Sequence, residues 1–304
     1  MILDIKVCAG IVLYNPEIER LKKNIAGIID QVDILYVFDN CSSNIIEIEQ
    51  MLQPYKKIVF IRSKKNEGIA VAVNKMVDAA LKDGCKWFLA LDQDSVCPSN
   101  MILEFSKYTG VEKVAIICPR PFDVRKAAID DTKEPRTKYE YVQYAITSGS
   151  FLNLDIFKRI GAFDEFLFVG LIDTDYCMRV NINEYRIIRC NNVIMDQEFG
   201  EITPSRFEKT FVRIGKTLHI KLILKLAYKR KVSPMRVYYA TRNQLYFIKK
   251  YKNYINENKE KSKLIIGSVF TILRAEEKKN VFKAMIRGWK EGQSVNIEPY
   301  TRVE

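Results

Sequence analysis

Two aspartates, Asp92 and Asp94, stand one residue apart directly after the apolar run Phe88–Leu91. A run of this length is typical of a buried strand, and it ends where the chain must turn out of the sheet. Because side chains alternate along an extended backbone, both carboxylates can point the same way. A hard divalent cation prefers such oxygens and completes its shell with water and phosphates. The pair predicts a cation that holds a nucleoside diphosphate. The alternative is a polar turn with a helix N-cap at Ser95 or Ser99.

Over the first 120 residues, apolar runs of strand length alternate with helical patterns. The strand-like runs are Val7–Tyr14, Ile34–Phe38, Ile58–Arg62, Trp87–Leu91 and Val114–Cys118. The helical patterns between them are Glu17–Ile29, Ile45–Leu52 and Ile69–Leu81. This alternation predicts an α/β fold, in which helices cover both faces of a mostly parallel sheet.

Polar clusters recur where the predicted strands end. They are Tyr14-Asn15-Pro16, Asp39-Asn40-Cys41-Ser42, Asn66-Glu67-Gly68 at the start of the helix that carries Asn74, and Asp92-Gln93-Asp94. Ligands of such sheets bind at the carboxyl ends of the strands. Four clusters at one edge therefore favour a binding site over a chance polar turn.

A second acidic pair, Asp173 and Asp175, lies in or just before the first turn of a predicted helix. The helix dipole favours carboxylates there, which is the structural explanation of the pair. The functional interpretation is that one of them is a general base. Between the two acidic pairs, residues 123–138 are polar and predict a loop that crosses the site or a flap. Residues 139–147 return to a strand-like pattern.

Composition and cysteine usage set further bounds. Hydrophobic residues make up 48% and charged residues 28%, as in ordinary folded proteins. Seven cysteines form no C-x-x-C pair, and several lie in apolar runs, so we expect small buried side chains in a reducing cytoplasm rather than a disulfide framework. Early charges at the N-terminus argue against a secretory signal. The longest apolar stretch, Leu264–Leu273, is too short to span a bilayer.

Positive charge gathers in the last third of the chain. Residues 1–200 hold 25 Lys and Arg against 28 Asp and Glu, whereas residues 201–304 hold 24 against 9. The net charges are −3 and +15. Basic segments seek phosphates in nucleic acids or on anionic membranes. The first part is slightly acidic and no RNA or DNA module is recognised, so we expect no nucleic-acid partner.

The chain resembles the inverting family 2 glycosyltransferases of the GT-A fold, most closely the bacterial rhamnosyltransferase branch. The resemblance covers nearly the whole chain and rests on modest motifs in a shared order. They are Val12-Leu13-Tyr14-Asn15-Pro16, Asp39-Asn40-Cys41-Ser42, Asn66-Glu67-Gly68-Ile69-Ala70-Val71-Ala72-Val73-Asn74, Asp92-Gln93-Asp94-Ser95, Thr147-Ser148-Gly149, Gly161-Ala162-Phe163-Asp164-Glu165, Asp173-Thr174-Asp175-Tyr176-Cys177-Met178-Arg179, Arg236-Val237-Tyr238-Tyr239-Ala240-Thr241-Arg242-Asn243 and Arg287-Gly288.

The resemblance implies a nucleotide-sugar site. Asp39 would accept a hydrogen bond from the pyrimidine ring, and Asp92 and Asp94 would bind Mg²⁺ or Mn²⁺ on the diphosphate. Gly68 would let the backbone approach closely. The other positions matched to the nucleotide-sugar are Tyr14, Asn15, Asn66, Asn74, Gln93, Ser148 and Gly149.

The resemblance also implies a general base at Asp173, which would deprotonate the acceptor hydroxyl and give inversion in one step. Many relatives carry Glu at the position of Ile172, so Asp175 remains a rival. Relatives often carry a metal- or diphosphate-contacting His where this chain has Gln197, which still offers an oxygen ligand. The single histidine, His219, lies elsewhere in a lysine-rich pattern.

The basic tail carries an apolar stripe at helical spacing, with lysines on another face. The stripe is Phe211, Ile214, Leu218, Leu222 and Leu226, and the lysines are Lys221, Lys225 and Lys229. Two interpretations stay open: a helix packed on the catalytic domain, or a helix at the surface of an anionic membrane. The aromatic and basic segment 238–247 could contribute to the acceptor or membrane face.

We therefore predict a GT-A catalytic domain over residues 1–205 and a basic, mainly helical region over 206–304. The expected activity is inverting, metal-dependent transfer of L-rhamnose from dTDP-L-rhamnose to a hydroxyl of a glycan, lipid-linked and at the cell surface. The alternative donors are a UDP-hexose or UDP-galactofuranose. An inactive nucleotide-sugar or membrane-binding scaffold is the alternative from another class. We expect a cytoplasmic protein at the inner face of the membrane.

Overall fold

The structure is a computed structural model that describes residues 5–122, 137–196, 202–206, 208–217, 224, 227–230 and 232–303. It divides into two compact units. The first unit comprises Met1–Phe168, Ile172–Glu198 and Arg302–Glu304, and the second comprises Val169–Leu171 and Phe199–Thr301.

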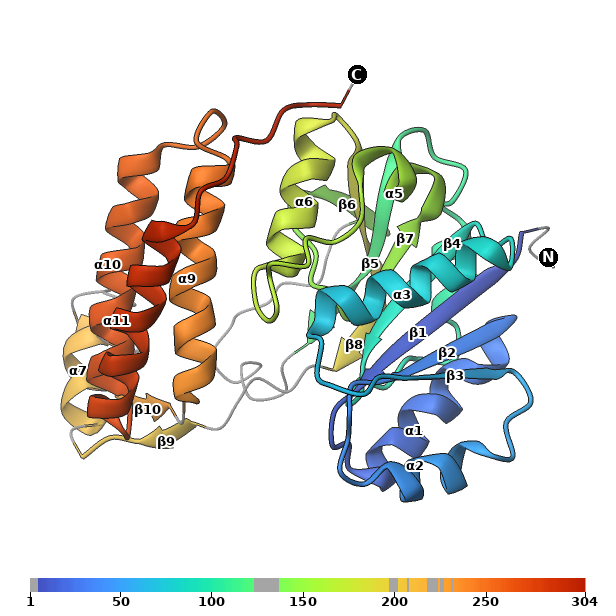
Figure 1. The fold of residues 1–304 in the computed structure, drawn as a ribbon, viewed down its shortest axis with the longest axis horizontal. Coiled ribbons are helices and arrows are strands. Elements are labelled where there is room, and N and C mark those ends of the chain that lie inside the picture. The colour runs from blue at the N-terminus through green and yellow to red at the C-terminus, as the bar shows by residue number, and fades with distance from the viewer. Residues whose placement is uncertain are drawn as a thin grey trace. The chain divides into compact units, whose positions relative to one another are not determined.

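The first unit is built on a sheet of eight described strands (Figure 1). In sequence order the strands are β1 (Val7–Leu13), β2 (Ile34–Asp39), β3 (Ile58–Arg62), β4 (Trp87–Asp92), β5 (Val114–Phe122), β6 (Tyr139–Val142), β7 (Ser150–Asn153) and β8 (Arg186–Asp196). Their order in the sheet is β3-β2-β1-β4-β7-β5-β8-β6. Strands β7 and β6 run antiparallel to their neighbours, and the other neighbouring strands pair in parallel.

The strand directions bring the predicted polar clusters to one edge. Val12 pairs with Asp92 and Leu13 with Asp39, so β1, β2 and β4 end side by side. Because β7 is reversed, it begins where β4 ends, and Ser150 pairs with Ala90. The segment before β7 therefore reaches the edge at which the parallel strands finish.

Helices cover both faces of this sheet. Successive side chains of a strand point to opposite faces, so the apolar residues on both faces need a layer to pack against. Helices α1 (Ile18–Ile28), α2 (Ile45–Leu52) and α4 (Met101–Ser106) share one buried cluster with the side chains of Ala9, Ile11 and Leu13. Helix α3 (Ile69–Lys82) covers the other face. There a Cβ built on Gly10 would lie 2.3 Å from Phe88 and 2.9 Å from Met76 of α3. The short helix η1 (Ile29–Gln31) follows α1, and α5 (Leu154–Ile160) and α6 (Ile172–Ile182) follow β7.

The second unit is mainly helical, as predicted. It contains α7 (Glu208–Thr217), α9 (Pro234–Lys250), α10 (Glu257–Arg274), α11 (Lys278–Ser294) and a two-stranded sheet of β9 (Ile202–Pro204) and β10 (Tyr228–Arg230) (Figure 1). Helices α9 and α11 pack closely, because a Cβ on Gly288 would lie 2.4 Å from the Tyr238 carbonyl oxygen. None of the helices in the described ranges is long and apolar enough to cross a membrane.

The predicted elements of the first 120 residues are confirmed to within one or two residues at most ends. The strand pattern over 139–147 is wrong beyond Val142, since β6 ends there and the chain crosses to β7, which was missed. The prediction that Lys229 lies on the lysine face of a helix is wrong, because this residue is on β10 and pairs with Thr203 in the small sheet. Leu218, Leu222, Leu226, Lys221, Lys225 and His219 lie outside the described residues.

The expectation that the cysteines are small buried side chains outside any disulfide is wrong for one pair. Cys8 and Cys85 are joined in the structure, with their Cα atoms 6.2 Å apart. Cys8 lies on β1 and Cys85 lies just before the adjacent strand β4, so residues separated by 77 positions meet. The expectation of small buried side chains is confirmed for Cys97, Cys118 and Cys177, and burial raises the pKa of each thiol to about 12. Cys41 is exposed.

The contact between α9 and α11 predicts opposite effects for two helical glycines. Gly288→Ala forces a methyl group against the Tyr238 carbonyl and should lower the free energy of unfolding by about 1–3 kcal/mol. Gly267→Ala on α10 meets nothing within 4 Å and should raise it by up to about 1 kcal/mol through helix propensity. Urea unfolding of both variants tests this. Equal effects would contradict the close approach of the two helices.

Candidate functional site

Hydrogen bonds join the ends of β1 and β2. The Asn15 amide donates to the Ser42 hydroxyl (2.9 Å), and the Ser43 amide donates to Asn15 Oδ1 (2.7 Å). The buried Asp39 carboxylate accepts from the Ser42 amide (3.1 Å). Asp39 thus stabilises the turn that follows β2. Its predicted contact with a pyrimidine stays a prediction.

The end of β4 is fixed by the segment that leads into β7. The Asp92 amide donates to the Ser148 hydroxyl (3.0 Å), and that hydroxyl lies 2.6 Å from the Ser95 hydroxyl. The Gly149 amide donates to the Ala90 carbonyl (2.8 Å), with Gly149 at a φ of +85° that favours glycine. These contacts contradict the N-cap alternative, because Ser95 is buried beside Ser148 and helix α4 begins after Asn100.

The residue between the two aspartates, Gln93, holds β1. Its Oε1 accepts from the Tyr14 amide (2.8 Å) and its Nε2 donates to the Tyr14 carbonyl (3.4 Å). With its backbone fixed in this way, Tyr14 leaves its side chain about half exposed at the strand ends. Gln93 therefore positions the site, and its predicted contact with the nucleotide-sugar stays a prediction.

Asp92 and Asp94 are exposed at this edge. No group of three or more His, Cys, Asp or Glu side chains that could hold a metal occurs in the part of the chain that the structure describes. Two accessible carboxylates nevertheless fit a cation such as Mg²⁺, which is commonly bound by one or two carboxylates together with water and substrate phosphates. Gln197, the predicted third ligand, lies outside the described residues.

The turn before α3 meets the segment that precedes α6. A Cβ on Gly68, where φ is +85°, would lie 2.6 Å from the Phe168 carbonyl oxygen, and that oxygen accepts from the Ile69 amide. The close approach at Gly68 is therefore to the protein's own backbone. Asn66 is exposed, with its Oδ1 accepting from the Gly68 amide (3.0 Å).

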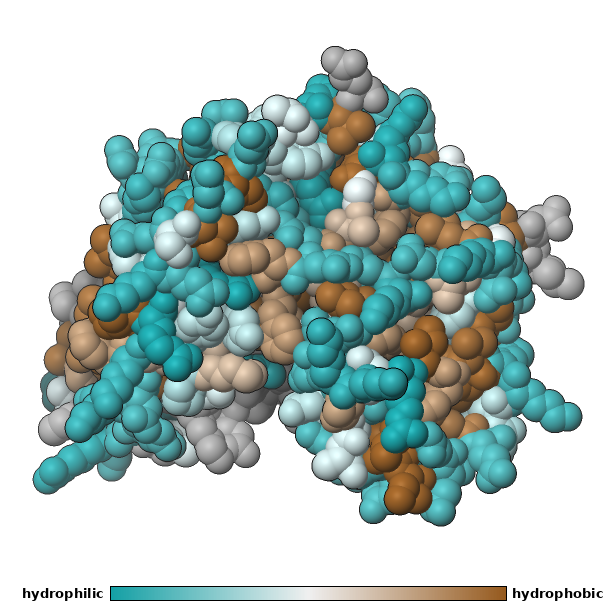
Figure 2. All heavy atoms as spheres, in the orientation of Figure 1, coloured by the Kyte–Doolittle hydropathy of each residue, from teal (hydrophilic) through white to brown (hydrophobic). Residues whose placement is uncertain are grey.

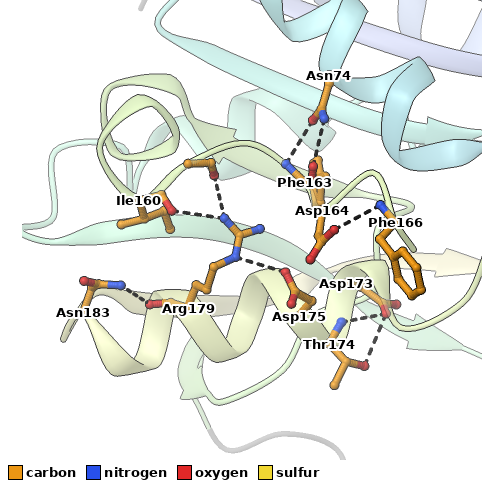
Figure 3. A network of polar contacts seen from close by, with 11 residues as sticks. Asn74, Ile160, Phe163, Asp164, Phe166, Asp173, Thr174, Asp175, Arg179 and Asn183 are labelled. Atoms are coloured by element: carbon orange, nitrogen blue, oxygen red, sulfur yellow. Dashed lines mark hydrogen bonds and ion pairs between the residues drawn. The ribbon is translucent and has the colours of Figure 1, made fainter. Parts of the chain in front are cut away.

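Asn74 is buried and used within the chain. Its Nδ2 donates to the Phe163 carbonyl (2.9 Å) and its Oδ1 accepts from the Phe163 amide (3.0 Å), as the dashed lines in Figure 3 show. The same Nδ2 lies 3.1 Å from Glu165 Oε1. Asn74 thus ties α3 to the segment before α6, and direct contact with a nucleotide-sugar stays a prediction.

The two aspartates of α6 lie in different environments (Figure 3). Asp175 is fully buried, and its Oδ2 accepts from Arg179 Nε at 3.0 Å. Arg179 Nη1 also donates to the carbonyls of Ile160 (3.1 Å) and Gly161 (2.9 Å). Asp175 thus pairs with Arg179 within α6, and Arg179 holds α6 against the end of α5.

Asp173, in contrast, is partly exposed at the first turn of α6. Its Oδ1 accepts from the Thr174 amide (2.8 Å) and its Oδ2 accepts from the Tyr144 hydroxyl (2.8 Å). A carboxylate in this setting can reach a ligand, whereas a buried one in an ion pair cannot without breaking that pair.

One short segment connects the two carboxylate sites. Tyr144 contacts Asp173, and Ser148, four residues later, contacts the backbone of Asp92. Four residues of extended chain span about 14 Å at most. The strand-end carboxylates and the Asp173 carboxylate therefore lie in one neighbourhood of the first unit, joined by this segment.

Some residues of this neighbourhood were missed from the sequence. Asn24 is buried on α1 and donates to the Asp92 carbonyl (2.7 Å), and Arg20 Nε donates to the Asp94 carbonyl (2.9 Å). A signal existed for Asn24, since it is a polar residue on the face that carries Leu21 and Ile28. Tyr144 had no comparable signal. The predicted loop over 123–138 lies outside the described residues except for its last two positions.

Comparison with known sequences gives two matches. The model of glycosyl transferase family 2 matches residues 8–164, about half of the chain. The dTDP-rhamnosyl transferase RfbF of Shigella flexneri is 27% identical over an alignment of 191 residues that covers 58% of this chain and 64% of that protein. The alignment thus covers a little under two thirds of this relative.

Comparison with solved structures concerns the fold. GalNAc-T7 with UDP, GalNAc and Mn²⁺ matches with a TM-score of 0.53 at 11% identity, over 70% of this chain and 48% of that one. TarS 1–349 of S. aureus in complex with UDP matches with a TM-score of 0.52 at 12% identity, over 95% and 91% of the two chains. The predicted GT-A fold is confirmed.

The environments of the two aspartates on α6 predict different stabilities for their variants. Asp175→Asn removes the buried carboxylate charge that pairs with Arg179 and should lower the free energy of unfolding by about 3 kcal/mol. Asp173→Asn removes a partly exposed charge and should change it by less than about 1 kcal/mol. Denaturant unfolding of both variants measures the difference. A larger loss for Asp173→Asn would contradict this division.

Proposed function

Because the chain belongs to glycosyl transferase family 2, we propose that it transfers a sugar from a nucleoside-diphosphate donor to an acceptor hydroxyl, with inversion at the anomeric carbon. The observation that carries this proposal is the short link between the exposed Asp92 and Asp94 and the partly exposed Asp173. One end of this neighbourhood offers oxygens for a metal and a diphosphate. The other offers a carboxylate for a proton.

In this proposal Asp92 and Asp94 hold Mg²⁺ or Mn²⁺ against the donor diphosphate. The bound cation would stabilise negative charge on the departing nucleoside diphosphate. Tyr14 and Asn15 border the nucleotide, and Asp39, Gln93 and Ser148 keep the three strand ends in register. Asn24 fixes the Asp92 carbonyl from the helix side.

Asp173 is the proposed general base. It takes the proton from the acceptor hydroxyl as that oxygen bonds to the anomeric carbon and the bond to the diphosphate breaks. The environment of Asp175 supports this choice, since its carboxylate is committed to Arg179 inside the protein. The role of Asp175 is then to fix the helix that presents Asp173.

We propose dTDP-L-rhamnose as the donor, on the similarity to the rhamnosyl transferase RfbF. A UDP-hexose or UDP-galactofuranose is the second candidate in the same class, and the UDP complex of a structural neighbour keeps it open. An inactive scaffold is the candidate from another class, motivated by Gln197 at the position of the usual His. Two accessible carboxylates near a candidate base favour the enzyme.

The acceptor side is proposed to involve residues 206–304, next to a donor and metal domain over 1–205. A lipid-linked glycan at an anionic membrane surface fits the net charge of +15 over residues 201–304. Helix α10 exposes Ile265, Ile266, Val269 and Leu273, each by half or more of its surface. Figure 2 shows such hydrophobic side chains among long hydrophilic ones on the helices of this unit. Apolar side chains among lysines are typical of helices that lie on a membrane surface.

The metal and base roles predict separate defects. Asp92→Ala and Asp94→Ala should lower affinity for the donor with Mn²⁺ by about tenfold or more, toward the value in EDTA. Asp173→Asn should keep donor affinity within about twofold and lower kcat by about 10²–10⁴-fold. Calorimetric titration and product formation measure these quantities.

Asp155→Ala is the matched control for the metal variants. Asp155 follows Asn153, which pairs with Trp87 at the start of β4, so it lies at the opposite edge of the sheet. Its loss should leave donor binding and transfer unchanged. Transfer that persists in Asp173→Asn and vanishes in a folded Asp175→Asn variant would reverse the assignment of the base.

The proposed membrane face predicts binding to anionic vesicles at low salt. Ile265→Glu with Val269→Glu should weaken binding to phosphatidylglycerol vesicles by about tenfold or more, because it removes apolar burial and adds negative charge. Ile46→Glu, at an exposed isoleucine of the first unit, is the matched control. Vesicle flotation measures the bound fraction. Equal binding by both variants would rule out this face.

A further inference from the structure

Three turns of α6 contact three consecutive residues of the segment between β6 and β7. Asn181 Nδ2 donates to the Gln143 carbonyl (2.9 Å), and the Cys177 sulfur lies 3.4 Å from both the amide nitrogen and the carbonyl oxygen of Ala145. Asp173 accepts from the Tyr144 hydroxyl. Positions 173, 177 and 181 are four residues apart and share one face of the helix. The backbone on both sides of Tyr144 is therefore fixed to the helix that carries Asp173.

We propose that Tyr144 is a positioning residue for Asp173, which it holds through the hydrogen bond from its hydroxyl to Oδ2. A carboxylate is free to rotate about its last bond unless its oxygens are held. Here the Thr174 amide holds Oδ1 and Tyr144 holds Oδ2, each at 2.8 Å. Carboxylate oxygens accept more than one hydrogen bond each, so acceptor capacity remains for a hydroxyl of the acceptor.

The phenol stays a donor throughout. Burial and the negative charge of Asp173 raise the pKa of Tyr144 well above its ordinary value, so its proton remains in place. Its hydroxyl can therefore hold Oδ2 of Asp173 in one direction before the acceptor arrives. This matters for catalysis only if Asp173 is the base, as proposed above.

Other ionisable groups on α6 and on the elements around it have partners of their own. They are Asp175 with Arg179, Asp164 with the Phe166 amide, Glu165 with Asn74, Arg186 with the Tyr141 ring and Arg189 with Glu140. The Cys177 thiol is neutral near pH 7, because burial raises its pKa to about 12. The contact between Tyr144 and Asp173 is therefore the interaction to change.

The test is the ¹³C chemical shift of the Asp173 carboxyl group in the full chain at one fixed pH, assigned with Asp173→Asn. Tyr144→Phe keeps the ring and removes the hydroxyl, so this resonance should move when the hydrogen bond to Oδ2 is lost. Tyr141→Phe is the matched control, since Tyr141 is 51% exposed against 47% for Tyr144 and lies three residues earlier. It should leave the Asp173 resonance unchanged.

A second readout is the rate of sugar transfer. In Tyr144→Phe kcat should fall by about tenfold, with KM for the donor unchanged, because the carboxylate is no longer held toward the acceptor. An Asp173 resonance identical to that of the unmodified chain would overturn the positioning role. If the resonance moves and kcat does not change, Tyr144 still positions the carboxylate, and the proposed function of Asp173 as base fails instead.

Discussion

The reversed strand β7 is the constraint on which the site depends. Its insertion between β4 and β5 means that the chain must approach the sheet at the edge where the parallel strands end. The residues of that approach have little freedom, because Gly149 bonds to Ala90 and Ser148 bonds to Asp92. A few residues earlier, the same segment lies along α6 and meets Asp173. One crossing of the chain thus links the strand-end carboxylates to the carboxylate of Asp173.

Stability and chemistry are divided between neighbouring residues of the same type. Asp175 forms a buried ion pair with Arg179, which also donates to two carbonyls at the end of α5. Asp173, half a turn earlier, faces outward and keeps acceptor capacity. The side chains of Asp39 and Gln93 likewise accept hydrogen bonds from backbone amides. Tyr14, Asp92 and Asp94, in contrast, are exposed. The polar clusters at the strand ends are therefore partly scaffold and partly exposed surface.

Local pattern was sufficient to predict the first five strands, three helices and the edge where polar residues gather. It could not separate scaffold from ligand surface, because the direction of an amide or carboxylate depends on partners far along the chain, such as Phe163 for Asn74. The disulfide between Cys8 and Cys85 and the pairing of Lys229 in β10 also depend on distant segments. The four-residue strand β7 is too short for a periodic signal. Asn24 was detectable as a polar residue on an apolar helix face.

The central claim is that the strand-end carboxylates form a metal-dependent site for a nucleotide-sugar. Thermal unfolding of the unmodified chain with a panel of nucleotide-sugars, in Mn²⁺ or in EDTA, tests this claim most directly. The predicted result is a rise in Tm with dTDP-L-rhamnose that exceeds the rise with UDP-sugars and disappears in EDTA. A larger rise with a UDP-sugar would keep the site and replace the donor. No rise with any donor in the presence of Mn²⁺ would contradict the claim and favour a scaffold.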